Sequence, residues 1–543
     1  MYDYDYDYVI VGAGSAGCVL ASRLSENPAN RVLLLEAGGR DWSPIIHIPL
    51  LAGVAYFAKS INWGYDTEPE PNLKNRELHW PRGKVIGGSS SINGMMYVRG
   101  QPQDYETWRQ MGNEGWDYSS VLPYFKRAEG HVEKNDSPFH GSDGPWKIKR
   151  AYSDNPLYHA FFDACRASGH RESDDFNGRQ QEGYQWHDFN VVKGRRQSTA
   201  VAFLHPAMKR PNLHVETHAH ATRVLFEGKR AVGVEYDWHG TRKEARAGRE
   251  VILSGGAINS PALLQLSGVG NGEALRNLGI PVVHDLPGVG QNLQDHLGVY
   301  VQHECLQPIT MYRWFRPDRA VGMMLQVMLF GTGVAAAIPL EAGLFAKSNP
   351  DLETPDLQIS LVPGLNLETT MKGQGKHGFL IHTYQLRPES RGSIELKSAN
   401  PFDKPLMKPN YLSARKDVEV TREGVKIVRN LFSQDAFKPF LGKAISPAPG
   451  VTSDADIEDW VRDSAETVFH PTSSNKMGTD PMAVVDPQLK VHGIEGLRVV
   501  DASVMPVIDS GNTQAPTVMI AEKAADMILG RGPLPQEDPF ATA

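Results

Sequence analysis

Three glycines that directly follow an apolar run are the residues of this chain whose spacing points most clearly to chemistry. They are Gly12, Gly14 and Gly17, and a second apolar run ends at Glu36. In this pattern the first glycine allows a tight turn, the second lets the backbone approach a pyrophosphate, and the third lets a helix pack close to the strand. Free N–H groups at the helix start suit phosphates, and Glu36 suits ribose hydroxyls. The sequence therefore predicts a dinucleotide site.

The strand–turn–helix pattern around these glycines is one part of a longer α/β arrangement. Further strand patterns cover 213–216, 223–226, 231–236 and 250–253, and a helical pattern covers 513–529. Between about 300 and 465, strand patterns at 357–362 and 379–386 and charged helical patterns at 417–432 and 454–462 indicate a second domain on an antiparallel sheet. We predict an α/β fold (α+β overall) with a discontinuous Rossmann-like domain. Its parts are 1–300, with excursions into the second domain around 150–195, and 466–543, and the inserted domain is 301–465.

Composition excludes several classes of protein. The 543-residue chain has a net charge of −7 and is 41% hydrophobic, which predicts a large core and no nucleic-acid partner. Three widely spaced cysteines (Cys18, Cys165 and Cys305) predict no disulfide framework and no metal site. They fit a reducing, cytoplasmic setting, and the acidic N-terminus lacks the features of a signal peptide.

One apolar stretch, 321–339, nearly reaches the length of a membrane span. It contains Gln326 and three internal glycines and ends in proline. We therefore expect a buried helix and loop that line a cavity, and no transmembrane segment, with peripheral membrane contact as the alternative.

Three further segments resemble one family over essentially the whole chain. They are His79 to Met95, which includes Gly87-Gly88-Ser89-Ser90; Gly255 to Leu264; and the ending with Phe469-His470-Pro471 and Gly511 to Thr517. Together with the N-terminal glycines they resemble the glucose–methanol–choline (GMC) oxidoreductases, in particular the choline-dehydrogenase-like and alcohol dehydrogenase or oxidase members. The resemblance implies a FAD-binding domain, a substrate-binding domain, and oxidation of an alcohol to a carbonyl.

The resemblance also implies roles for individual residues. His470 would be the catalytic base, and Asn512 would orient the substrate and stabilise charge on its oxygen. The residues expected to bind the cofactor, beside the N-terminal set, are Gly87, Gly88, Ser89, Asn93, Val224, Asp501, Ala502 and Thr513. Those expected to line the substrate pocket are Met95, Val468 and Phe469.

Two positions depart from the family pattern. Some relatives attach FAD covalently through a histidine where this chain has Ile92, so we predict dissociable FAD. After the histidine many relatives read H-P-x-G-T-x-x-M-G, whereas this chain has Ser473 and Ser474 in place of glycine and threonine. The chemistry should survive this change, with a different local loop.

The substrate and acceptor stay open at this point. The chain shows no obvious acidic or aromatic cage for a quaternary ammonium group, which favours an uncharged primary alcohol, aryl or aliphatic, over a choline-type substrate. A hydroxynitrile lyase and a flavin-binding protein without catalysis are alternatives on the same fold. The electron acceptor is expected to be oxygen, a quinone or a carrier protein.

Overall fold

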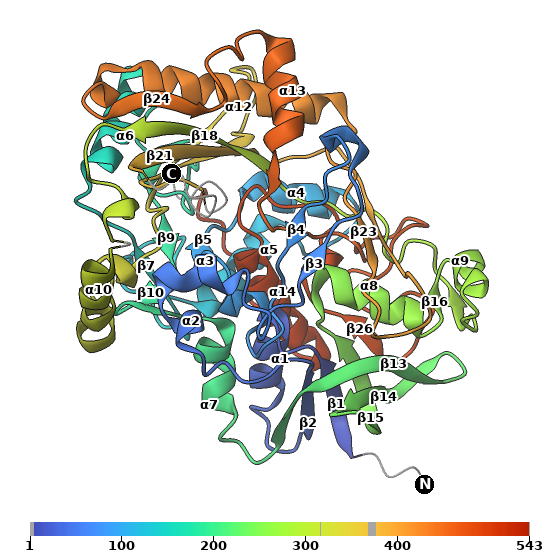
Figure 1. Cartoon of the computed structure of the whole chain (residues 1–543). Helices are drawn as coiled ribbons and strands as arrows, with labels where there is room; N and C mark the ends of the chain where they lie inside the picture. The colour runs from blue at the N-terminus through green and yellow to red at the C-terminus, as the bar shows by residue number, and fades with distance from the viewer. Residues whose placement is uncertain (1–4, 315, 367–375, 542–543) are drawn as a thin grey trace.

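The computed structural model describes residues 5–314, 316–366 and 376–541, which form two seven-stranded sheets (Figure 1). In the first sheet, five strands run parallel in the order β12 (Leu213–Thr217), β2 (Val32–Glu36), β1 (Tyr6–Val11), β15 (Thr241–Leu253) and β26 (Leu497–Val499). In chain order this is 3-2-1-4-5. Ligands of such sheets bind beyond the carboxyl ends of the strands, which is where β1 leads into Gly12.

An antiparallel meander extends the first sheet. β13 (Ala219–Glu227) pairs with β14 (Arg230–Trp238), which pairs with the N-terminal half of β15. The long strand β15 thus belongs to the parallel sheet at its carboxyl end and to the meander at its amino end.

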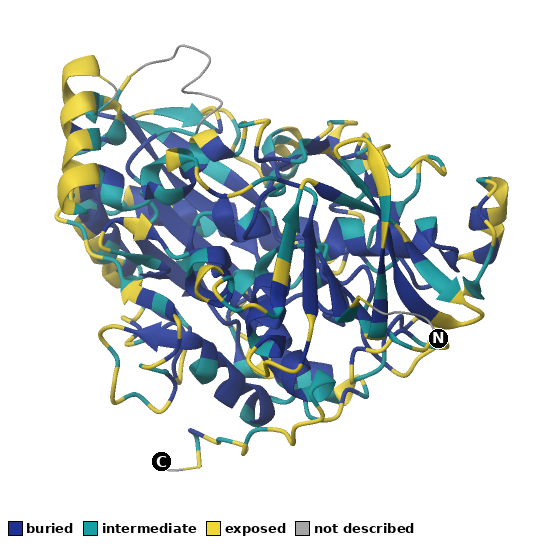
Figure 2. Ribbon diagram, turned by 90° about the horizontal axis from the view of Figure 1, so that it is seen from below, coloured by how far each residue is buried: buried dark blue, intermediate teal, exposed yellow. Residues whose placement is uncertain are grey.

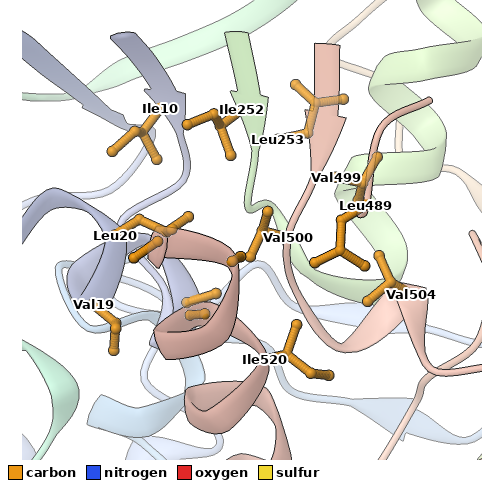
Figure 3. Close-up of a cluster of buried hydrophobic side chains, with 14 of the residues drawn as sticks. Ile10, Val19, Leu20, Ile252, Leu253, Leu489, Val499, Val500, Val504 and Ile520 are labelled. Atoms are coloured by element: carbon orange, nitrogen blue, oxygen red, sulfur yellow. The ribbon is translucent and has the colours of Figure 1, made fainter. Parts of the chain in front are cut away.

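Helices α1 (Ser15–Leu24) and α14 (Gln514–Ile528) pack against each other, although they lie about as far apart in the sequence as the chain allows. Figure 3 shows Ile10 of β1, Ile252 of β15 and Val499 of β26 above Leu20 of α1 and Ile520 of α14. All five side chains are fully buried. The C-terminal residues therefore complete the domain that the N-terminal residues begin.

The second sheet is antiparallel. Its order is β24 (Leu441–Ser446), β18 (Leu297–Cys305), β21 (Gly378–Gln385), β20 (Leu357–Val362), β19 (Ala342–Ala346) and β8 (Gly183–Trp186), with β25 (Glu466–Thr467) also on β18. Helix α12 (Arg415–Ser433) covers β18, β20 and β21, and α13 (Asp454–Ser464) packs on α12. The predicted fold class is confirmed: a Rossmann-like domain and a second domain on an antiparallel sheet. The limits at 300 and 465 stay a prediction.

The remaining longer helices lie around these two sheets. They are α4 (Pro102–Gln110), α5 (Tyr118–Ala128), α6 (Pro156–Ala167), α8 (Gly256–Leu266), α9 (Gly272–Asn277) and α10 (Pro317–Phe330). Helix α5 packs on α14, and α8 follows β15 as the second strand–turn–helix unit. Among the described residues no helix combines the length and the apolarity that crossing a bilayer requires.

The expectation of a buried helix in the stretch 321–339 is wrong for one face. Helix α10 buries Met323 and Val327, but its outer side chains are exposed, and it stands out as an exposed helix at the edge of Figure 2. Leu325 is 51% exposed and Phe330 74%. Its apolar residues spread around the helix, whereas only one face packs on other residues that the structure describes.

Candidate active site

The turn after β1 packs against a second glycine turn. A Cβ on Gly17 would lie 1.9 Å from the Gly12 carbonyl oxygen, so this glycine allows α1 to start close to the strand. Gly88 has φ +53°, and a Cβ on it would lie 2.7 Å from the Cα of Gly14. The N–H of Gly87 donates to the Ala13 carbonyl over 2.7 Å. The two glycine segments predicted from separate motifs therefore form one contact.

Glu36 holds this turn from the end of β2. Its Oε2 accepts the Ala13 N–H at 2.9 Å, and its Oε1 accepts the Gly38 N–H at 2.7 Å. Burial raises the pKa of Glu36 to about 7, against the lowering effect of these two bonds. The carboxylate that was predicted to bind ribose thus also fixes the loop backbone.

A single cavity of about 1770 Å³ runs from the glycine turns to His470. The predicted residues that line it are Gly12, Gly14, Glu36, Gly88, Ser89, Asn93, Met95, Val468, Phe469, His470, Asp501, Ala502, Asn512 and Thr513. Gly17 and Gly87 lie outside the lining and act through packing.

Val224 does not line the cavity. It is buried on β13, where its N–H donates to Ser267 Oγ over 2.8 Å. The part of β13 that reaches the cavity is three residues earlier, at Ala219, His220 and Ala221. The role of Val224 on the adenine side of the cofactor stays a prediction.

The C-terminal segment places polar groups along the same cavity. Asp501 accepts hydrogen bonds from the Gly256 N–H (2.8 Å) and from Ser260 Oγ (2.6 Å), which ties β26 to the start of α8. Asn93 donates to Gln514 at the N-terminus of α14. The free N–H groups and positive dipole end of α14 therefore meet the cavity beside Asn93.

Hydrogen bonds from a buried arginine fix the position of Asn93. Arg196, which is fully buried, donates from Nη1 to the Asn93 carbonyl and to Asn93 Oδ1, both over 2.7 Å. Burial lowers the pKa of Arg196 to about 9. This buried cation fixes the amide that sequence similarity placed beside the flavin ring.

His470 lies between a histidine and an amide. Its Nδ1 is 2.9 Å from Nδ1 of His296, and its Nε2 is 3.1 Å from Nδ2 of Asn512. The Nε2 of His296 is 3.0 Å from the Leu386 carbonyl oxygen, which can only accept. His296 therefore carries its proton on Nε2.

This chain of contacts fixes the tautomer of His470. Burial lowers the pKa of His296 to about 4, so this ring is neutral at pH 7 and its Nδ1 is a bare acceptor. His470 must donate to it from Nδ1. Burial and the nearby positive charge of Arg82 hold the pKa of His470 well below its usual range. Its Nε2 is consequently unprotonated and faces Asn512 in the cavity.

Asp295 holds the backbone of the same loop. Its Oδ1 accepts the His470 N–H at 2.6 Å, and its Oδ2 accepts from Thr467 Oγ1 at 2.6 Å and from Tyr411. Burial raises the pKa of Asp295 to about 6. Two consecutive residues before β18, Asp295 and His296, thus hold His470 by its backbone and by its ring.

Ser473, which stands where many relatives have glycine, has a left-handed backbone conformation. Ser473 has φ +71°, and Phe469 has φ +66°. This left-handed region favours glycine, the residue that many relatives have at 473. Ser473 donates its N–H to the Ala502 carbonyl over 3.2 Å, which keeps the loop on the C-terminal segment. At this position a serine therefore adopts a backbone conformation that is typical of glycine.

Sequence reasoning missed His296, Asp295 and the aromatic rings of the pocket. His296 is one of 19 histidines and carries no local pattern that marks it. Rings from distant segments meet around His470: Tyr56 and Phe469 have centroids 5.2 Å apart, and Tyr384 lies 6.1 Å from His470. Aromatic rings therefore line this part of the cavity, which the sequence alone did not reveal.

A separate buried cluster contains groups that can bind metals. Potential ligand atoms of Glu129, His131 and His140 lie within 4.8 Å of one another. Glu129 already pairs with Arg99 and His140, and Lys134 Nζ lies 3.3 Å from His140 Nε2. These cations oppose a further positive ion, so we interpret the cluster as an ion-pair network. The expectation of no metal site stays a prediction.

The residues around the cavity fit a flavin dinucleotide. The cavity joins a glycine-rich turn at a helix N-terminus, which suits a pyrophosphate, to a second helix N-terminus near His470. Asn512 Oδ1 and Gln514 Nε2 are buried there without partners among the described residues, as expected where a ligand supplies them.

Comparison with known proteins agrees with this geometry. The family described as GMC oxidoreductase matches residues 6–298 with its N-terminal part and 388–521 with its C-terminal part. The mitochondrial choline dehydrogenase of Mus musculus is 50% identical over 533 residues, covering 96% of this chain and 89% of that protein. The oxygen-dependent choline dehydrogenase of Chromohalobacter salexigens is 48% identical, with 98% and 96% covered.

Comparison with solved structures shows the same fold. Pyridoxine 4-oxidase from Mesorbium loti superimposes with a TM-score of 0.87 at 29% identity, covering 97% of this chain and 100% of that one. A formate oxidase gives a TM-score of 0.90 at 27% identity, with 98% and 99% covered. The chain therefore belongs to the GMC oxidoreductase family: it is an FAD-dependent oxidoreductase that acts on CH–OH donors.

Proposed function

We propose that this enzyme oxidises a primary alcohol to its aldehyde, with His470 as the base that removes the hydroxyl proton. The observation that carries the proposal is the bare Nε2 of His470, fixed by His296 on one side and facing Asn512 on the other. A base must be unprotonated and within hydrogen-bond reach of the proton that it takes. FAD, when bound, supplies the acceptor for the hydride of the carbinol carbon.

Asn512 and Arg82 support the same step electrostatically. Nδ2 of Asn512 is a donor that can turn to the substrate oxygen as negative charge develops there. Arg82 donates to the Phe469 carbonyl over 2.8 Å and is partly buried near the histidine, so its positive charge favours an alkoxide over the neutral alcohol. After proton transfer, the unpartnered Oδ1 of Asn512 can accept from Nε2–H of His470.

The cofactor roles follow the lining of the cavity. Gly12, Gly14, Gly88 and Ser89 would receive the pyrophosphate, Glu36 the ribose, and Asp501, Ala502 and Thr513 the chain toward the ring. Ile92 is buried where some relatives have a histidine, and its side chain offers no nucleophile. We infer that FAD is dissociable, so acid precipitation of the protein should leave the flavin in solution.

Two substrate classes have support. The relatives named choline dehydrogenases favour choline, and rings of Tyr56, Phe469, Tyr300 and Tyr384 in the lining can hold an onium group. The carboxylate on this side of the cavity, Glu466, pairs with Arg76, which favours an uncharged alcohol. Met95 and Val468 would contact either substrate.

We infer oxygen or a lipid-soluble or protein carrier as the electron acceptor, and a cytoplasmic enzyme. The three cysteines of the chain, all free and buried, support a reducing compartment. The exposed apolar side of α10 supports peripheral contact with a membrane, which co-sedimentation with lipid vesicles tests.

The test is anaerobic mixing of the FAD-loaded enzyme with a panel of alcohols that includes choline. Loss of the oxidised flavin band, with formation of the aldehyde, is expected for at least one of them, and readmitted air then distinguishes an oxidase from a dehydrogenase. His470→Gln should slow flavin reduction by about 10²–10⁴. His159→Ala, at an exposed histidine, should not. Unchanged reduction in His470→Gln would sink the assignment, and release of cyanide from a cyanohydrin without bleaching would indicate a lyase.

A further inference from the structure

The cavity extends well past the groups that a flavin and a reacting carbon need. Its volume of about 1770 Å³ exceeds the usual 300–1,000 Å³ of a ligand site. One side of it is formed by residues between 311 and 365, and none of the described lining residues in that range is charged. We call this side the apolar arm, and define it by Met311, Trp314, Met323, Met324, Ile338 and Leu340.

The apolar arm begins at the reacting end. A Cβ on Gly94 would lie 3.5 Å from Cδ1 of Ile338, so Ile338 packs beside the residue that follows Asn93. Ile338 and Leu340 also pack with Met95, which was predicted to line the pocket. The arm is therefore continuous with the position expected for the flavin ring.

The far part of the arm is made by α10. Met323 is buried with Ile48 and Ala335, while Met324, next to it, is only partly buried and faces the cavity. Methionine side chains are flexible and polarisable, and they adapt to irregular apolar ligands. A wall of this kind suits a flexible chain better than a rigid polar group.

We propose that the apolar arm binds the extended aliphatic chain of a primary alcohol, with the hydroxyl at His470. This rests on the proposed function, because it assumes that an alcohol is oxidised at that end. Each methylene that leaves water for the arm should tighten binding by a constant factor, about fourfold when it is fully buried. The specificity for the alcohol would then rise with chain length until the arm is full.

The experiment measures flavin reduction by 1-alkanols from two to ten carbons with the FAD-loaded enzyme, and by choline. The expected result is a rise in the apparent second-order rate constant of about two- to fourfold per methylene over several carbons. Met324→Asn should flatten this rise, because it places a polar amide in the apolar arm. Met328→Asn, one turn along α10 and 69% exposed, is the matched control and should keep the rise.

Three outcomes would overturn the proposal. They are a flat series in the unmodified enzyme, an equal loss in the two methionine variants, and reduction by choline with none by any alkanol. In the last case the oxidation of an alcohol at His470 stands and only the arm is refuted. Absence of reduction by both alkanols and choline would instead remove the proposed function itself.

Discussion

Replacing His296 should disable His470 without touching it. In His296→Leu, the Nδ1–H of His470 loses its acceptor while it stays buried. The other tautomer, with the proton on Nε2, can be satisfied if the Asn512 amide turns its unpartnered Oδ1 toward the ring. That tautomer has no bare nitrogen in the cavity and cannot act as the base. The substitution therefore favours an inactive form of a correctly folded site.

The size of the effect follows from the cost of a buried donor without a partner. That cost is about 1–3 kcal/mol, so the base-competent tautomer should fall about 5- to 150-fold, and the rate of flavin reduction should fall by the same factor. His296→Asn is the matched variant, because its amide oxygen can accept from Nδ1 of His470. It should recover most of the rate.

Stopped-flow reduction across pH separates this role from simple packing. His296 is neutral and accepts the Nδ1–H of His470, and this bond is stronger to the charged ring than to the neutral one, so His296→Leu should lower the pKa of His470 further and move the acid limb of the profile to lower pH. Bound FAD and the melting temperature serve as controls for folding. Equal rates in the Leu and Asn variants, or an unmoved acid limb, would refute the tautomer argument.

Two further substitutions test the cofactor side, and a third tests the backbone conformation of Ser473. Gly88→Ala places a Cβ against Gly14 and should abolish FAD binding, whereas Gly228→Ala, with the same sign of φ but no neighbour within 4 Å, should cost only stability, as thermal melts with and without FAD would show. Glu36→Ala leaves two loop N–H groups unpaired and should weaken FAD binding about 10- to 100-fold by fluorescence titration; unchanged affinity would count against its role. Ser473→Gly relieves a left-handed serine and should stabilise the protein by up to about 1 kcal/mol in urea unfolding, where a clear loss would contradict the strain.

The parts of the fold that local patterns determine could be predicted. The turn from Gly12 to Gly17 and its acid are set within one strand–turn–helix–strand unit, so spacing alone identifies them. Strand β20 was predicted with its observed limits, 357–362, because its alternation is strong and both ends are clear. The prediction for helix α10 was less accurate, because an apolar composition does not reveal which face of the helix packs against the rest of the protein.

Contacts made over long distances in the sequence could not be predicted. His296 and His470 are 174 residues apart, and nothing in either local sequence shows that their rings meet. The strand β13 shows a related limit: a strand pattern locates β13 but not the residues at which that strand passes the cavity, which are Ala219, His220 and Ala221. Tyr56 and Phe469 come together only when the two sheets are assembled, so the aromatic lining has no local signature.

The position of the base at the junction of the two sheets has a mechanistic consequence. His470 follows β25, which pairs with the start of β18, and the residues just before β18 supply its ring partner and its backbone anchor. Asn512 lies on the segment that enters α14, in the core of the Rossmann-like domain. A shift of one domain against the other would therefore change the distance between His470 and Asn512 while leaving the tautomer intact. In the proposed mechanism, the antiparallel sheet orients the base and the nucleotide domain stabilises the substrate oxygen. This mechanism therefore requires the two domains to keep their relative position.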